Sequence, residues 1–193
     1  MDQSPDFYSF VFRGLLTEQS LDKAGRHSRD KFSEEASREM IERLGISLLE
    51  GELVSKAKRM AMVYTAICAF ENYVRDFVSK KLMEIKGENW WLECVSEKIR
   101  IKAESRKKDE SNARWHTPRG DALISYTEFG DLASIMGQNW DQFEPHVDSL
   151  DWAKHVIESL ERSRNVIMHS GELAPQDIER VGMNIRDWIR QVG

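Results

Sequence analysis

Apolar residues recur every three or four positions along most of the chain, and this spacing predicts α-helices. The longest such pattern runs from about Glu52 to Ile85, and Gly87 is expected to end it. Its apolar positions are Met60, Val63, Ile67, Phe70, Val74, Val78, Leu82 and Ile85. We expect this face of one long helix to lie in the core of the protein.

Shorter patterns predict further helical elements on both sides of the long one. Their expected ranges are 7–16, 33–44, 90–101, 123–140, 149–169 and 175–192. Ser33 and Ser149 are suitable N-caps, and Pro175 suits the first turn of the last helix. No segment shows a convincing strand pattern, so the sequence predicts an all-α fold. We expect an N-terminal helical extension over residues 1–51 and a helical domain over residues 52–193.

Composition agrees with an ordinary globular helical protein. Of 193 residues, 40% are hydrophobic and 32% charged, and Gly and Pro are few. Two cysteines are too few for a disulfide framework, and we see neither a signal peptide nor an apolar run long enough to span a membrane. The His and Cys residues lack metal-ligand spacing. We therefore expect a cytoplasmic protein with no metal, no cofactor and no membrane partner.

The charge is uneven along the chain. Residues 98–119 contain eight basic and three acidic residues, a net charge of +5, whereas the whole chain carries −5. The overall charge excludes a protein that coats nucleic acid through general positive charge. Residues 102–121 lack apolar periodicity and contain Pro118 and Gly120, so we expect a basic loop or hairpin-like insertion near 98–120.

This basic loop has two interpretations. Cations with an aromatic residue can bind single-stranded RNA by phosphate contact and stacking. The alternative is a solvated, disordered loop with no ligand. The candidate RNA-binding residues are Lys98, Arg100, Lys102, Arg106, Lys107, Lys108, Arg114 and Trp115.

One position in the penultimate helix departs from its apolar pattern. Ile157, Leu160, position 164 and Ile167 follow each other by three, four and three residues, yet position 164 is Arg164. A buried guanidinium is costly unless it is paired and hydrogen-bonded. Arg164 is therefore either partnered by a buried acid or placed where this helix meets another protein chain.

His169 follows Arg164 by five residues, where the helix is expected to end, and Asn165 lies between them. Arg can hold an anion in a rigid fork, and His can move a proton near neutral pH. The three residues suit chemistry at a phosphate. The alternative is that basic residues near a helix C-terminus only complement the helix dipole.

The motif and its surroundings resemble a known superfamily. The run from Arg164 to His169 resembles the R-x4–6-H motif of the HEPN superfamily. Residues 126–132, followed by Asn139-Trp140 and Phe143, look like its Swt-type branch, as do residues 70–75 followed by Trp90-Trp91. The resemblance covers roughly residues 60–192.

The resemblance implies a fold and an activity. HEPN domains are antiparallel helical bundles that dimerise and bring two R…H motifs together. Active members cut RNA without metal, using the 2′-hydroxyl as nucleophile. On this chain His169 would be the acid–base residue, Arg164 would stabilise charge on the phosphate, and Asn165 would orient the site. Glu71 would support Arg164, although a plain helix-surface pair with Arg75 is an equal alternative.

The expected partners follow from this reading: RNA as substrate, a second copy of the chain, and a regulatory protein. Family members commonly act as toxins or in antiviral defence. Many HEPN toxins carry a modified Tyr two residues after the motif His, but this position is Gly171 here, which argues against that regulation. Two other functions stay open: a non-catalytic module that binds RNA, a nucleotide or a protein, and a structural subunit that docks through residues 7–16.

Overall fold

The computed structural model describes residues 17, 20–21, 34–113 and 115–192. Every regular element in these ranges is helical, and the described residues form no strand, which confirms the all-α prediction. The predicted helix over residues 7–16 lies outside the described residues. The chain divides into two compact units, residues 1–54 and 55–193. No helix of the described part is long and apolar enough to cross a lipid bilayer.

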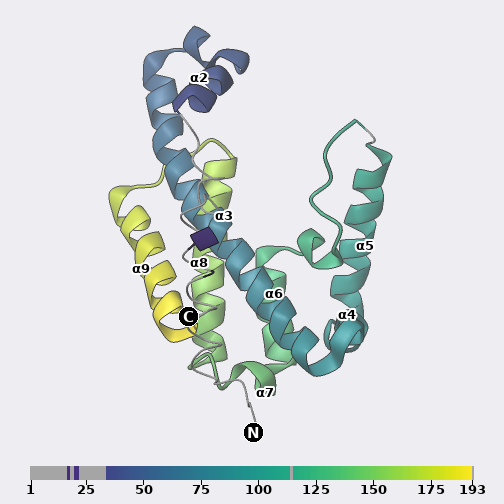
Figure 1. The fold of residues 1–193 in the computed structure, drawn as a ribbon. Coiled ribbons are helices and arrows are strands. Elements are labelled where there is room, and N and C mark those ends of the chain that lie inside the picture. Colours follow the sequence, from purple (N-terminus) through teal and green to yellow (C-terminus); the bar gives the residue numbers. More distant parts are fainter. Residues whose placement is uncertain (1–16, 18–19, 22–33, 114, 193) are drawn as a thin grey trace, which may run out of the picture. The chain divides into compact units, whose positions relative to one another are not determined.

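Long and short helices follow one another along the described part of the chain (Figure 1). The α-helices are α2 (Glu34–Arg43), α3 (Gly51–Lys86), α4 (Trp90–Cys94), α5 (Glu97–Asn112), α6 (Phe129–Gln138), α7 (Trp140–Phe143), α8 (Leu150–Met168) and α9 (Pro175–Val192). The 3-10 helices are η2 (Ile46–Leu48), η3 (Gly87–Asn89) and η4 (Leu123–Tyr126). In the first unit, Gly45 has a φ of 62° between α2 and η2, a conformation that suits glycine.

The core of the second unit is built on α3. All of the predicted core positions on α3 are buried except Ile85, which is 44% exposed at the end of the helix. Phe70 makes edge-to-face contacts with Phe129 of α6 and Trp188 of α9, at ring-centroid distances of 6.1 and 5.5 Å. One α3 residue therefore joins two other helices to the same core.

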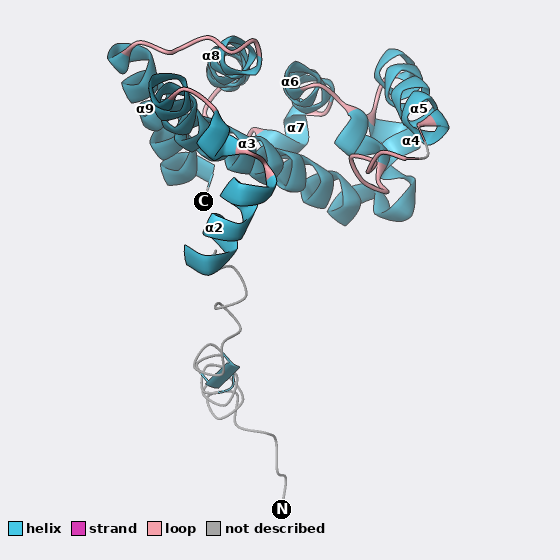
Figure 2. Ribbon diagram, turned by 90° about the horizontal axis from the view of Figure 1, so that it is seen from above, coloured by secondary structure: helices cyan, strands magenta, loops and turns pink. Residues whose placement is uncertain are grey.

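The remaining helices are arranged along α3. In the view of Figure 2, α8, α6 and α5 stand in a row beside α3. Helix α8 packs against both α6 and α9, and α5 packs against η4. The α3 helix thus positions α8 on one part of its length and the α5–η4 region on another.

The predicted loop near residues 98–120 is wrong up to Asn112, because these residues are helical. Helix α5 continues to Asn112, and the turn region begins only after it. On the inward side of α5, buried Ile99 and Ala103 are followed one turn later by Arg106 and Lys107. The apolar pattern stops there although the helix does not, because polar side chains with partners occupy the inward positions.

The predicted helix over residues 123–140 is divided into η4, α6 and α7. A capping box starts α6, since the Glu128 side chain accepts from the Asp131 backbone and the Asp131 side chain accepts from the Glu128 N–H at 2.9 Å. Gly137 lies inside α6 and does not end it. The predicted N-cap of α8 is confirmed, because Ser149 Oγ accepts from the Trp152 N–H at 3.0 Å.

Candidate active site

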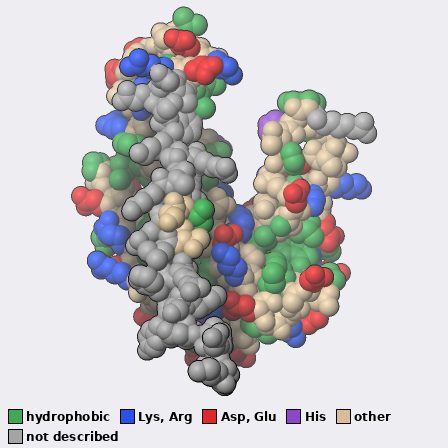
Figure 3. All heavy atoms as spheres, in the orientation of Figure 1, with side chains coloured by type: hydrophobic (Ala, Val, Ile, Leu, Met, Phe, Trp, Pro, Cys, Tyr) green, Lys and Arg blue, Asp and Glu red, His purple; other side chains and the backbone are tan. Residues whose placement is uncertain are grey.

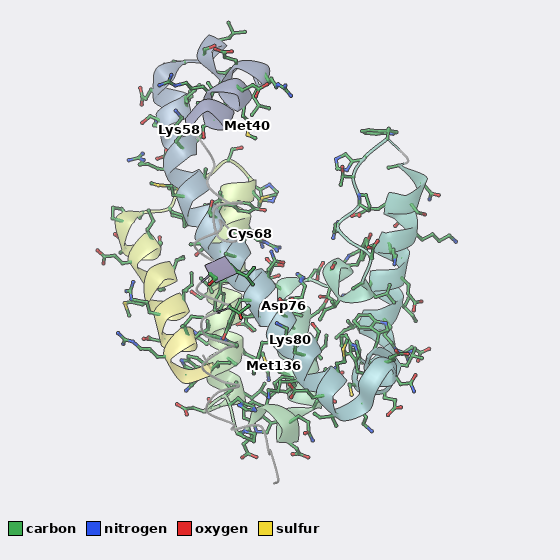
Figure 4. All side chains as sticks on the ribbon, viewed as in Figure 1. Met40, Lys58, Cys68, Asp76, Lys80 and Met136 are labelled. Atoms are coloured by element: carbon green, nitrogen blue, oxygen red, sulfur yellow. The ribbon has the colours of Figure 1, made fainter. Side chains whose placement is uncertain are left out.

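A groove of 630 Å³ opens between α3, α8 and the segment around η4. Helix α8 contributes Arg164, Asn165, Met168 and His169 to its lining. The predicted catalytic residues therefore share one groove. Cys68, another lining residue, is labelled near the middle of α3 in Figure 4.

The floor of the groove is a chain of three charges that we call the inner layer: Arg75, Glu71 and Arg164. Glu71 Oε2 accepts from Arg164 Nη1 at 2.9 Å, and Glu71 Oε1 accepts from Arg75 Nη2 at 2.7 Å. The side chains of Glu71 and Arg75 are only 13% and 12% exposed, and that of Arg164 is 25% exposed. One carboxylate serves two guanidinium groups, so the inner layer keeps one uncompensated positive charge.

The geometry decides two alternatives left open by the sequence. Arg164 follows the core phase of α8 and has the acidic partner that this position required. Glu71 makes the helix pair with Arg75 and the contact with Arg164 at the same time. Because Arg164 is held at one nitrogen by Glu71, its guanidinium has a fixed place at the base of the groove.

The exposed residues at the end of α8, Asn165, Met168 and His169, form what we call the outer edge. All three are exposed, Met168 at 61%. The His169 ring donates or accepts no hydrogen bond within the described part of the chain, whereas its backbone N–H donates to the Asn165 carbonyl at 3.1 Å. The imidazole is thus open to a ligand in the groove while its backbone is anchored.

The backbone after His169 closes α8 with a Schellman motif. The Ser170 N–H donates to the Ile167 carbonyl at 2.9 Å, and the Gly171 N–H donates to the Val166 carbonyl at 2.8 Å. Ser170 occupies the left-handed position with a φ of 61°. A Cβ at Gly171 would lie 2.7 Å from Val166 Cγ1 and 2.9 Å from the Val166 carbonyl oxygen. A side chain at position 171 would therefore require the end of α8 to shift.

The opposite wall of the groove consists of Arg119, Ser125, Thr127 and Glu128. No spacing in the sequence predicts that these residues lie near the Arg–His motif. Arg75 links this wall to the inner layer, because its Nη1 donates to the Ile124 carbonyl at 3.4 Å.

Two of the predicted RNA-binding residues hold this wall in place instead. Arg106 Nη1 donates to the Tyr126 carbonyl at 2.9 Å and also pairs with Glu128. Lys107 Nζ donates to the Asp121 carbonyl at 2.5 Å. Their charges have partners inside the protein, so an RNA contact at either residue would compete with these bonds.

The other predicted RNA-binding residues differ in how far their side chains are exposed. Lys98, Lys102 and Lys108 are exposed on α5 and make no ion pair within the described residues, while Arg100 is half-buried. Trp115 is 87% exposed beyond the end of α5. Arg114 lies outside the described residues. The exposed lysines and Trp115 remain available to a ligand.

Sequence reasoning missed several groove residues. Tyr64, Cys68 and Asn72 follow one another by four residues on α3, on the same side as Glu71. That spacing could have indicated them once Glu71 was singled out. Arg119 lies 45 residues before Arg164 in a segment without periodicity, and no local pattern indicates it.

The visible surface of the described residues carries no large basic patch. Figure 3 shows acidic and basic side chains intermixed over the visible face of the described residues. Within the described ranges, no three His, Cys, Asp or Glu side chains gather in a way that could hold a metal ion. Arginine, asparagine and histidine are therefore the groups that the α8 side of the groove offers to a ligand.

Comparison with known families accounts for most of the second unit. The family model described as Swt1-like HEPN matches residues 66–193. The chain belongs to the Swt1-like HEPN family. The matched part of this HEPN domain includes the inner layer, the outer edge and the α5–η4 wall. No curated protein and no solved structure matches the chain.

Proposed function

We propose that this HEPN protein is an endoribonuclease that cuts RNA with its own side chains at a site formed by two copies of the chain. One observation carries the proposal: Arg164, fixed by Glu71, and His169, whose imidazole has no partner among the described residues, belong to one open groove. Membership of the family supports the choice of RNA as ligand.

The proposed reaction is attack of the ribose 2′-hydroxyl on the adjacent phosphorus. His169 takes the proton of the 2′-hydroxyl, the 2′-oxygen bonds to phosphorus, and the bond to the 5′-oxygen of the next nucleotide breaks. The products are a 2′,3′-cyclic phosphate and a 5′-hydroxyl end, which needs one proton from an acid. Arg164 offsets the negative charge that grows on the phosphate oxygens, and Asn165 orients the phosphate.

The need for both a base and an acid favours two copies of the site. Each chain supplies one His to the groove, and a two-fold axis supplies the second. The outward face of α3 beside the groove carries Met62, Ala66, Ala69 and Tyr73, all exposed. We propose this face, which is apolar and spaced by four, three and four residues, as the homodimer surface.

The nuclease activity is tested with purified full chain, end-labelled RNA and EDTA. We expect cleavage products that end in a cyclic phosphate, and none from RNA whose 2′-hydroxyls are methylated. His169→Ala and Arg164→Ala should each lower the rate by at least about 10²-fold. His155→Ala and Arg162→Ala are matched controls, because these α8 residues are exposed and line a different cavity.

The outcomes separate the remaining functions. Cleavage that survives loss of both Arg164 and His169 contradicts the proposed mechanism. RNA binding without cleavage under any condition supports the non-catalytic module instead. The homodimer is tested separately by sedimentation of Ala69→Glu, which should be monomeric and inactive with an unchanged helix content. A role as a toxin or in antiviral defence is part of the proposal, and expression in a host with and without His169→Ala tests it by growth.

A further inference from the structure

Arg119 is a cation of the groove that the Arg–His motif does not include. It comes from the segment after α5, stands on the wall opposite Arg164, and has a side chain that is 54% exposed. Neither of its terminal nitrogens donates a hydrogen bond to any described residue, although its Nε lies 2.5 Å from Glu110 Oε1. Part of the guanidinium is thus anchored and part is open.

The surroundings of Arg119 fix where the open part stands. The Arg119 backbone N–H donates to Glu110 Oε2 at 3.1 Å, so one carboxylate holds both the main chain and the side chain. The guanidinium carbon lies 6.0 Å from the ring centroid of Tyr126, whose hydroxyl donates to the Gly120 carbonyl at 3.0 Å. A cation held against an aromatic ring loses little entropy when it binds an anion.

The charges of the groove suit a polyanion. Glu71 is shared by Arg75 and Arg164, and Glu128 on the Arg119 wall is paired with Arg106. Neither carboxylate of the lining is therefore left to repel an anion. The volume of 630 Å³ is within the range of pockets for whole organic ligands, which is more than one phosphate fills.

We propose that Arg119 binds a second phosphate, next to the one cut at Arg164 and His169. The groove then takes single-stranded RNA with at least two consecutive phosphates, one on each wall. This inference rests on the proposed function for its choice of RNA, but it concerns binding and can be tested without cleavage.

The test measures binding of a fluorescent eight-nucleotide RNA with 2′-O-methyl groups to the full chain by anisotropy, between about 50 and 200 mM KCl. One lost phosphate contact lowers the slope of log affinity against log salt by about 0.7 for a single strand. We expect Arg119→Gln to show that loss with roughly 5- to 10-fold weaker binding at the lowest salt. Arg119→Lys should keep the slope, and Arg162→Gln, on the far side of α8, should match wild type.

A second measurement uses substrate length. Arg119→Gln should cut the eight-nucleotide RNA more slowly but a dinucleotide with one phosphate at the wild-type rate. An unchanged salt slope and affinity in Arg119→Gln, or no binding by wild type, overturns the inference. If wild type cuts no RNA but Arg119→Gln still lowers the slope of log affinity against log salt, the proposed function is overturned. The second phosphate contact then still stands. Equal melting temperatures of wild type and Arg119→Gln show that the wall is intact.

Discussion

The inner layer and the outer edge are two parts of one groove with opposite physical character. In the inner layer, Glu71, Arg75 and Arg164 are largely buried and paired with one another. At the outer edge, Asn165 and His169 are exposed, and the imidazole has no partner among the described residues. Charges that are buried and paired are held in one place, whereas an exposed imidazole without a partner is open to a ligand. One helix, α8, therefore carries a side chain anchored by the core at Arg164 and a side chain open to the groove at His169, five positions further on.

The largest difference between the inner layer and the outer edge is expected when the acid of the inner layer is removed. Glu71→Leu leaves two guanidinium groups without their anion in a largely buried place, so we expect a loss of about 2–3 kcal/mol in unfolding free energy. Urea unfolding followed by circular dichroism measures it. His169→Ala is the matched variant and should stay within about 0.5 kcal/mol of wild type. Similar losses of unfolding free energy in Glu71→Leu and His169→Ala would show that the inner layer and the outer edge do not differ in their contribution to stability.

Gly171→Ala tests how the outer edge is anchored. The added Cβ meets a backbone oxygen at 2.9 Å and Val166 Cγ1 at 2.7 Å, so the end of α8 must shift. We expect a loss of about 1–3 kcal/mol in unfolding free energy and a displaced His169. The amide and ring signals of His169 in NMR spectra should move, while those of Arg164 should stay. An Ala variant as stable as wild type would show that the turn does not constrain position 171.

Ser170→Gly should raise the unfolding free energy, by less than Gly171→Ala lowers it. Ser170 has a φ of 61°, which costs an ordinary residue about 1 kcal/mol and costs glycine almost nothing. We expect the variant to gain about 0.5–1 kcal/mol, less the entropy that glycine loses on folding. The midpoint of thermal unfolding measures the gain. A lower unfolding midpoint in Ser170→Gly would mean that the Ser170 side chain stabilises the fold by more than its backbone conformation costs.

The smallest effect concerns the two cysteines. Burial raises the pKa of the Cys94 thiol, so Cys94 stays protonated at pH 8 and should react slowly with a disulfide reagent. Cys68 lines the groove and is only partly buried, and it should react faster. The Cys68→Ser and Cys94→Ser variants assign the two rates. The stabilisation associated with the neutral Cys94 thiol is fully present below the pKa of the unfolded chain and is lost as the pH rises through the folded pKa.

Sequence reasoning succeeded where apolar residues determine position. The stripe of α3, the Ser149 cap and the phase of Arg164 on α8 all follow from helix periodicity, and the structure confirms them. It failed on the second half of α5, because Arg106 and Lys107 stand at inward positions that usually hold apolar residues. In the pattern of apolar and polar positions, a charged residue looks the same whether its side chain faces solvent or a carbonyl on another segment.

Contacts between segments that are distant in the sequence could not be predicted from local patterns. Arg119 and Thr127 reach the groove only because the chain turns back after α5, and no spacing along the sequence encodes that turn. The pairing of Glu71 with Arg164 spans 93 positions and was predicted only through the family resemblance. Local pattern identifies which helix face is buried, but not which polar groups meet across it.

The wall opposite Arg164 is tied to its surroundings mainly through main-chain oxygens. Arg75, Arg106 and Lys107 donate to the carbonyls of Ile124, Tyr126 and Asp121, and the Tyr126 hydroxyl donates to the carbonyl of Gly120. Every amino acid supplies a carbonyl, so the three ties made by Arg75, Arg106 and Lys107 do not depend on which side chains the segment carries. Evolution can therefore exchange the residues of this wall that face the groove and alter which ligand the groove prefers, while the path of the chain stays the same.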